Sequence, residues 1–122
     1  MARLESAIRV VLEFKEAFNR HDLTGMMQLL SSDCIFDSPD PAPDGTVYSG
    51  KEAIIQFWRD FFNQSPDAHL EIEDSFSLGE RCVMRWIRSS LEGAEKKVHV
   101  RGVDLFRVRS GLICEQLSYV KG

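Results

Sequence analysis

The sequence lacks long hydrophobic runs and has no excess of basic charge. No apolar stretch approaches the roughly 20 residues that span a membrane. The opening residues, MARLESAIRVVLEF, have the spacing of an amphipathic helix and not the pattern of a signal peptide. With 15 basic and 19 acidic residues the net charge is -4, which argues against a nucleic-acid-binding module. We therefore expect a cytoplasmic protein without nucleic-acid or membrane partners.

Cysteine and histidine are too few and too scattered to build a metal site or a disulfide framework. The three cysteines, Cys34, Cys82 and Cys114, are an odd number without CxxC spacing, and we expect them to be buried free thiols. The three histidines show neither HxH nor HExxH spacing. We expect no metal and no cofactor.

The sequence also lacks a linker, an internal repeat and a low-complexity segment. At 122 residues and 43% hydrophobic content, the chain has the size of one compact domain with one core. Three of its prolines and a glycine fall within PDPAPDG, residues 39–45, which predicts an irregular loop. The whole chain, 1–122, is expected to form a single domain.

The first half of the chain predicts three helices. Apolar residues recur at helical spacing from Leu4 to Phe18, and this helix should stop near residue 20. Asp22 is expected to cap a short second helix that includes Leu30. A third helix is expected to begin at Ser49, where SGKE has the spacing of a capping box, and to end before residue 66. Its aromatic bulk on two sides indicates a helix sunk into the fold.

The remaining segments predict strands. A short strand is expected over residues 34–38, and four longer ones over residues 68–78, 82–90, 98–108 and 112–120, joined by short turns. In the strand over 68–78 the even-numbered residues are mostly apolar, so we expect them to face the core throughout. Helices followed by an antiparallel meander indicate an α+β fold in which the helices cover one face of a curved sheet.

An acid lies on the apolar face of the strand over residues 98–108. Alternation places Val100, Asp104 and Phe106 on that face. Because an isolated ionised acid in an apolar medium is very unfavourable, Asp104 must have a partner or line a cavity. Arg85 is one candidate partner, since an antiparallel register can set it beside residues 101–104. The alternation on the strand of Arg85 is ambiguous, however, and Trp86 could face inward instead.

Arginines alternate with apolar residues on two of the expected strands. They are Arg85, Arg88, Arg101, Arg107 and Arg109. Such arginines mainly belong to a solvated face. An inward Arg85 would be an exception, and it would keep Asp104 ionised.

A curved sheet closed by helices leaves a pocket wherever the inward side chains do not fill it. Such pockets are the usual small-molecule sites, mostly apolar with a few placed polar groups. The ligand-binding candidates are Phe14, Phe18, Phe36, Ser38, Phe57, Trp58, Phe61, Gln116 and Ser118. The aromatic residues could equally be core, and Gln116 and Ser118 could donate to the helices above them.

Three stretches resemble the SnoaL-like branch of the nuclear-transport-factor-2-like superfamily, which also contains ketosteroid isomerases, limonene-epoxide hydrolases and scytalone dehydratases. They are residues 29–39, the helix beginning SGKEAI within residues 49–58, and GVDLFRVRSGLI with the strand that follows it, residues 101–120. The resemblance covers nearly the whole chain and is more specific for the fold than for the reaction. It implies a cone-shaped α+β barrel, commonly a homodimer packed through the outer sheet face.

Carried over residue by residue, the resemblance leaves one functional acid. Asp104 matches the acid that helps a tyrosine stabilise an enolate oxygen in the ketosteroid isomerases. The tyrosine position falls on Phe14 and the proton-shuttling acid on Ser38, so that mechanism is not expected. Epoxide hydrolases hold water with an Asp-Arg-Asp set, and Ser118 occupies the position of one of those acids. SnoaL cyclases use a pocket acid on a polyketide enolate, and Asp104 is the candidate for that role.

The leading hypothesis is therefore a protein that binds an apolar, ring-containing or polyketide-like small molecule. Asp104, alone or with Arg85, would act as acid and base in cofactor-free isomerisation, cyclisation, dehydration or hydrolysis. The alternative is a non-catalytic ligand-binding or protein-interaction domain of the same fold. In that case Asp104 is a buried acid satisfied by hydrogen bonds.

Overall fold

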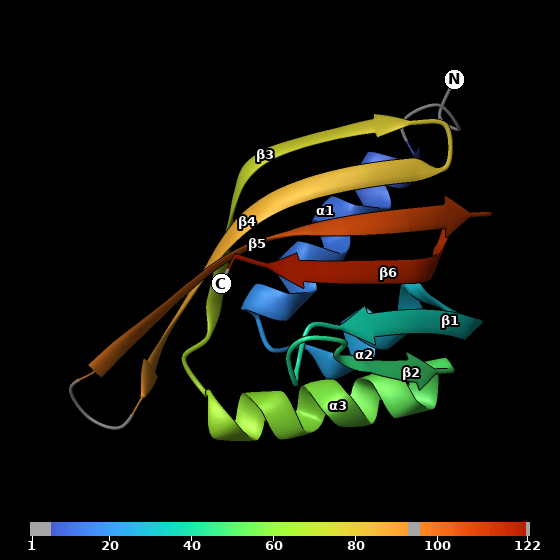
Figure 1. Cartoon of the computed structure of the whole chain (residues 1–122). Helices are drawn as coiled ribbons and strands as arrows, with labels where there is room; N and C mark the ends of the chain where they lie inside the picture. Colours follow the sequence, from blue (N-terminus) through green and yellow to red (C-terminus); the bar gives the residue numbers. More distant parts are fainter. Residues whose placement is uncertain (1–5, 93–95, 122) are drawn as a thin grey trace.

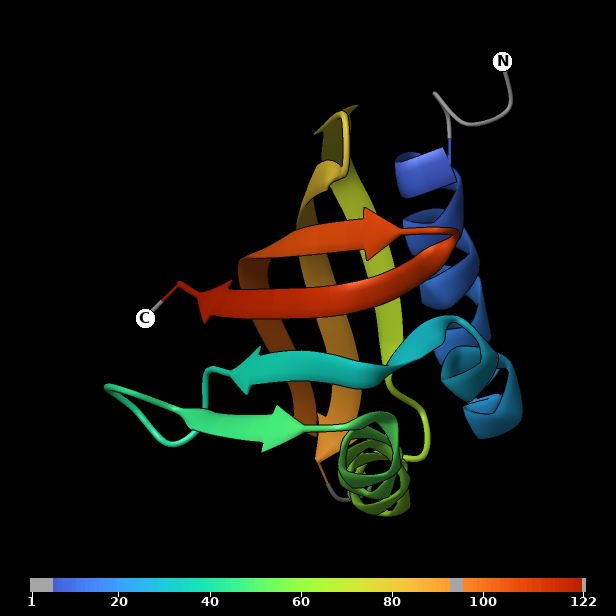
Figure 2. The same cartoon turned by 90° about the vertical axis from the view of Figure 1, so that its right-hand side faces the viewer.

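Three helices lie against one side of a curved six-stranded sheet in the computed structural model, which describes residues 6–92 and 96–121 (Figures 1 and 2). The helices are α1 (Ser6–Asn19), α2 (Leu23–Gln28) and α3 (Lys51–Gln64). The strands are β1 (Leu30–Ser38), β2 (Thr46–Ser49), β3 (His69–Leu78), β4 (Arg81–Glu92), β5 (Lys96–Arg109) and β6 (Leu112–Val120). The predicted α+β class is confirmed.

The strands follow the order β2-β1-β6-β5-β4-β3 across the sheet. The antiparallel meander predicted for the last four strands is confirmed, and β6 has the predicted bounds. Two features were not predicted: β1 runs parallel to β6, and the short strand β2 pairs antiparallel with β1. Figure 1 shows α1 crossing the sheet and α3 alongside β1 and β2, so the two helices close different sides of the cone.

The two N-terminal helices differ from the prediction at their ends. The expected start of the first helix at Leu4 lies outside the described residues. Asp22 caps α2 as predicted, because its Oδ1 accepts a hydrogen bond from the backbone N–H of Gly25 at 3.0 Å. The extension of this helix to Leu30 is wrong. The Leu29 carbonyl instead accepts from the N–H of Ile113 in β6, and the chain enters β1 at the next residue.

The capping box predicted at the start of the third helix is wrong. Ser49 is the last residue of β2, where the sheet pairs it with Ile35. The N-cap position belongs to Gly50, which has a φ of 90° and no side-chain capping bond. A glycine suits this backbone conformation because other residues are strained there. The helix ends at Gln64, as expected from the proline that follows.

A bulge in β3 reverses which residues face the core. Leu70 is buried as predicted, but the register against β4 shifts between Ile72 and Asp74. Beyond the bulge the even-numbered residues turn outward, and Phe76 and Leu78 are 60% and 84% exposed. The expectation that even parity faces the core along the whole strand is therefore wrong, because one extra residue changes the face of every later side chain.

No helix within the described parts of the chain combines the length and the apolar character that crossing a membrane would require.

Candidate functional site

A cavity of about 70 Å³ lies between the concave face of the sheet and helices α1 and α3. A single water needs about 10–15 Å³, so the space holds a group larger than a few atoms. The lining includes Asp104 and all nine residues proposed from the sequence as ligand contacts: Phe14, Phe18, Phe36, Ser38, Phe57, Trp58, Phe61, Gln116 and Ser118. The fold thus gathers residues from α1, β1, α3, β5 and β6 around one space. Their binding of a ligand stays a prediction.

Aromatic rings from three elements build one wall of the cavity. The ring centroid of Trp58 lies 5.4 Å from those of Phe18, Phe36 and Phe61, and 4.9 Å from that of Phe57. Most of these contacts are edge-to-face, the arrangement that aromatic pairs favour. Phe57 and Phe61 are only partly buried, so their rings are both packed and available to a ligand.

Asp104 accepts hydrogen bonds from side chains on both neighbouring strands, Trp86 on β4 and Gln116 and Ser118 on β6. It is 5% exposed, with its Oδ1 accepting from Nε1 of Trp86 at 3.0 Å and its Oδ2 accepting from Nε2 of Gln116 at 2.9 Å. The hydroxyl of Ser118 is a further hydrogen-bond partner. Gln116 and Ser118 therefore form hydrogen bonds with the acid on the neighbouring strand and not with the helices above them.

Burial raises the pKa of Asp104 above its ordinary value of 3.8, although hydrogen bonds from Ser118, Gln116 and Trp86 and the charge of Arg88 oppose the rise. The indole N–H of Trp86 can only donate, so Oδ1 is an acceptor in both protonation states. The proton of the neutral acid therefore belongs on Oδ2. There the amide of Gln116 can either donate through its nitrogen or accept through its oxygen.

Arg85 is not part of this site. Its side chain is 57% exposed on the outer face of the sheet, where its guanidinium lies 3.9 Å from the carboxylate of Glu73. In β4 the residues that face inward are Met84 and Trp86, both buried. The alternative in which Arg85 assists Asp104 is therefore wrong, because the two side chains lie on opposite faces of the sheet.

The arginine of the cavity is Arg88, which sequence reasoning had placed on the solvated face. Its guanidinium carbon lies 4.9 Å from the ring centroid of Phe61 and 5.9 Å from that of Trp86. Burial lowers the pKa of Arg88, while the charges of Asp40 and Asp104 raise it. The signal that could have found it is the alternation itself, because an inward Trp86 requires an inward residue two positions later.

Gly102 allows Trp86 to reach Asp104. Trp86 in β4 pairs with Gly102 in β5, and a Cβ atom at position 102 would lie 2.5 Å from Cζ2 of the Trp86 ring. It would also lie 2.5 Å from the carbonyl oxygen of Tyr119. The indole therefore lies directly over the bare backbone of β5. Its N–H reaches the acid two residues further along that strand.

The buried cysteines do not supply a second reactive group. Burial raises the pKa of the Cys34 thiol to about 12 and that of Cys82 to about 11. Both are therefore neutral thiols near pH 7, and the thiol is a poor nucleophile compared with the thiolate. Within residues 6–92 and 96–121, no three His, Cys, Asp or Glu side chains are grouped so that they could hold a metal ion.

The comparison with known families identifies this architecture. A profile of the SnoaL-like domain matches residues 11–116. The chain belongs to the SnoaL-like domain family. A crystal structure of a nuclear-transport-factor-2-like protein of unknown function from Mesorhizobium loti is 32% identical over 98% of this chain and 94% of its own, with a TM-score of 0.84. No curated protein matches by sequence.

Two further neighbours show the shared fold alone. A proposed polyketide cyclase from Streptomyces antibioticus is 21% identical over 94% of this chain and 91% of its own, with a TM-score of 0.83. A proposed SnoaL-like polyketide cyclase from Jannaschia is 14% identical over 99% and 89% of the two chains, with a TM-score of 0.85. The family resemblance drawn from residues 29–39, 49–58 and 101–120 is confirmed.

Proposed function

We propose that this SnoaL-like protein binds a small apolar, ring-containing or polyketide-like compound and catalyses cofactor-free proton transfer with Asp104 as acid and base. One observation carries the proposal: a buried carboxyl group of raised pKa forms part of the wall of a largely aromatic cavity. A titratable group in such a setting is a candidate proton-transfer residue. The proposed polyketide cyclases among the neighbours support the class of compound.

The surroundings of Asp104 make both of its protonation states accessible. Desolvation favours the neutral acid, and the donors Trp86, Gln116 and Ser118 favour the carboxylate. The carboxylate takes a proton from a carbon next to a carbonyl group, which leaves a protonated Asp104 and a substrate enolate. Return of that proton to another atom of the enolate completes an isomerisation, and Asp104 is a carboxylate again.

Hydrogen exchange tests this function without knowledge of the natural substrate. The purified protein is incubated in deuterium oxide with a panel of enolisable ring ketones, and exchange is followed by proton NMR. We expect catalysed exchange on at least one ketone and a loss of about 100-fold or more in Asp104→Asn, since general acid–base catalysis contributes roughly 10²- to 10⁴-fold. Asp74→Asn, which removes an exposed carboxylate from β3, is the matched control. Equal rates in wild type and Asp104→Asn would refute the role of Asp104.

A second candidate function is ligand binding without catalysis. It is favoured by the fact that protein donors already occupy both oxygens of Asp104, as expected of a structural acceptor. In that case ring ketones bind and perturb the tryptophan fluorescence, yet no deuterium enters any of them. The same measurements therefore separate the two candidates.

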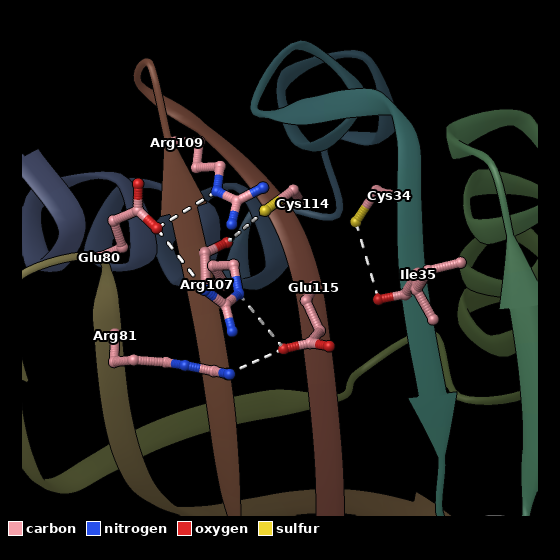
Figure 3. Close-up of polar contacts among 8 residues, drawn as sticks. All are labelled: Cys34, Ile35, Glu80, Arg81, Arg107, Arg109, Cys114 and Glu115. Carbon is pink, nitrogen blue, oxygen red and sulfur yellow. Dashed lines mark hydrogen bonds and ion pairs between the residues drawn. The ribbon is translucent and has the colours of Figure 1, made fainter.

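We also propose that the protein is a homodimer packed through the outer face of the sheet. Large apolar side chains are exposed on that face of β2, β3 and β6, namely Val47, Phe76 and Tyr119. Ion pairs lie among them, including those of Arg81 and Arg107 with Glu115 (Figure 3). A face that mixes apolar groups with charges of both signs can pair with its own copy.

We also propose a cytoplasmic location, which is supported by the free thiols of Cys34, Cys82 and Cys114.

A further inference from the structure

We propose that Arg88 and Trp58 form a subsite for an anionic oxygen, so that the ligand of this cavity is a ring compound that carries a carboxylate. The inference rests on the proposed function, because it assigns the ligand class of the same cavity. It concerns recognition of the ligand by Arg88 and Trp58 and does not depend on the reaction.

Arg88 differs from the arginines of the outer face in having no acidic partner. Each of the others has a glutamate oxygen within 3.9 Å: Arg81, Arg85, Arg101, Arg107 and Arg109. Within the described residues, the guanidinium of Arg88 makes no hydrogen bond or ion pair, and it lies against the rings of Phe61 and Trp86. Arginine stays cationic, and its fork of N–H donors matches the two oxygens of a carboxylate. A partly desolvated cation on aromatic rings therefore favours an anionic ligand.

Trp58 supplies an independent second donor in the same cavity. The residue is 7% exposed, and its Nε1 is the one buried side-chain nitrogen or oxygen in the described parts of the chain that has no hydrogen-bond partner. Buried N–H groups are nearly always paired, so this one indicates an acceptor supplied by a ligand. The ring centroids of Trp58 and Phe61 are 5.4 Å apart, and the guanidinium of Arg88 lies over Phe61, so Trp58 and Arg88 are both neighbours of one ring.

The subsite is separated from the acid along the sheet. Met84 pairs with Asp104, whereas Arg88 lies four residues further along β4 and pairs with Val100. Four residues of strand separate the backbones of these two positions by about 13 Å, with Trp86 between them on the same face, and the charges of Arg88 and Asp104 still act on each other. A ring compound held by its carboxylate at Arg88 would place its ring against Trp86 and direct its far side towards Asp104.

The other charges of the lining are compatible with an anion. Lys15 and Asp40 also line the cavity, and the charge of Asp40 acts on Arg88 from a distance. When Asp104 is protonated, the lining carries two positive side chains, Arg88 and Lys15, and one negative side chain, Asp40. The neutral form of the acid therefore leaves a net positive cavity.

Binding of matched acids and amides tests the subsite. The ligands are phenylacetate and 3-phenylpropanoate with their neutral counterparts phenylacetamide and 3-phenylpropanamide, and the affinities are measured by calorimetry. We expect wild type to bind each acid about tenfold or more tightly than its amide, since a charge-assisted bidentate pair contributes an effect of that size. Arg88→Gln should remove the preference, and Arg88→Lys should keep part of it. Arg85→Gln, on the opposite face of the same strand, should change neither affinity.

A spectroscopic readout isolates Trp58. The protein has two tryptophans, so a ¹⁵N-correlated spectrum contains two indole N–H signals, and Trp58→Phe identifies which is which. We expect the acids to move the Trp58 signal to lower field through a new hydrogen bond. The Trp86 indole N–H should stay bonded to Asp104. Trp58→Phe should weaken binding of the acids severalfold more than that of the amides.

The outcomes separate this inference from the proposed function. Equal affinity for acids and amides, or a preference that survives in Arg88→Gln, would overturn the subsite while leaving proton transfer by Asp104 untouched. Asp104→Asn should retain the acid preference even though it loses exchange. Failure of all four compounds to bind at about 10 mM would count against both the subsite and the ligand-binding cavity.

Discussion

At the residue scale, Asp104 makes the stability of the protein depend on pH. Burial raises its folded-state pKa above the ordinary value of 3.8. Between those two pKa values the folded protein keeps a proton that the unfolded chain has released. The free energy of unfolding therefore falls as pH rises through this window and stays lowered above the folded-state pKa.

We predict that Asp104→Asn removes this contribution. Asparagine keeps an oxygen that can accept from Trp86, but it does not ionise. In urea unfolding from about pH 4 to about pH 8, wild type should lose stability relative to Asp104→Asn as pH rises. Asp104→Leu should instead cost about 2–4 kcal/mol across the range, because Trp86 and Gln116 both lose a buried acceptor. Parallel pH profiles for wild type and Asp104→Asn would contradict the raised pKa.

At the element scale, the contact between β4 and β5 depends on the absence of a side chain at position 102. We predict that Gly102→Ala destabilises the protein by about 1–3 kcal/mol, since the new methyl group overlaps the Trp86 ring. The ring must shift, which breaks its hydrogen bond to Asp104 and moves the Trp86 indole N–H signal in NMR. In a Trp86→Phe background, Gly102→Ala should lose less stability, because the overlap with the indole is reduced while the clash with the Tyr119 carbonyl remains. If the stability losses of Gly102→Ala and Trp86→Phe simply add in the double mutant, the position of the Trp86 ring does not depend on Gly102.

The elements also show where alternation alone can mislead. In β5 a regular register carries Val100, Asp104 and Phe106 on one face, and the sequence placed the acid correctly. In β3 the same reasoning fails beyond Ile72, since a bulge leaves the residue pattern unchanged while it reverses the faces. Strand β2 was missed because its four residues follow a proline-rich loop and gain stability only by pairing with β1.

At the scale of the whole molecule, the outer sheet face is the interface of the proposed homodimer. We predict that wild type sediments as a dimer at tens of micromolar and that Leu105→Glu sediments as a monomer. Leu105 is partly exposed near the middle of that face, where a charge would be buried without a partner. Leu12→Glu, which changes an exposed apolar residue of α1, should leave the dimer intact. A wild-type monomer at these concentrations would contradict the proposed interface.

The sequence by itself determined the α+β class, the antiparallel meander and part of the cavity lining, namely Asp104 and the nine residues proposed as ligand contacts. It did so because helical and strand periodicities are local properties, and a strand without bulges transmits its parity over its whole length. Tertiary structure decided which arginine faces Asp104's cavity. From the sequence, either face of β4 could have packed on the core, because Met84 and Trp86 alternate with Arg85. The pairing with β5 decides between them. Gly102 leaves room for the Trp86 ring, so Trp86 and Arg88 face inward and Arg85 faces outward. The physical reason is that the face of a strand is set by its partners' register, which no single stretch of sequence contains.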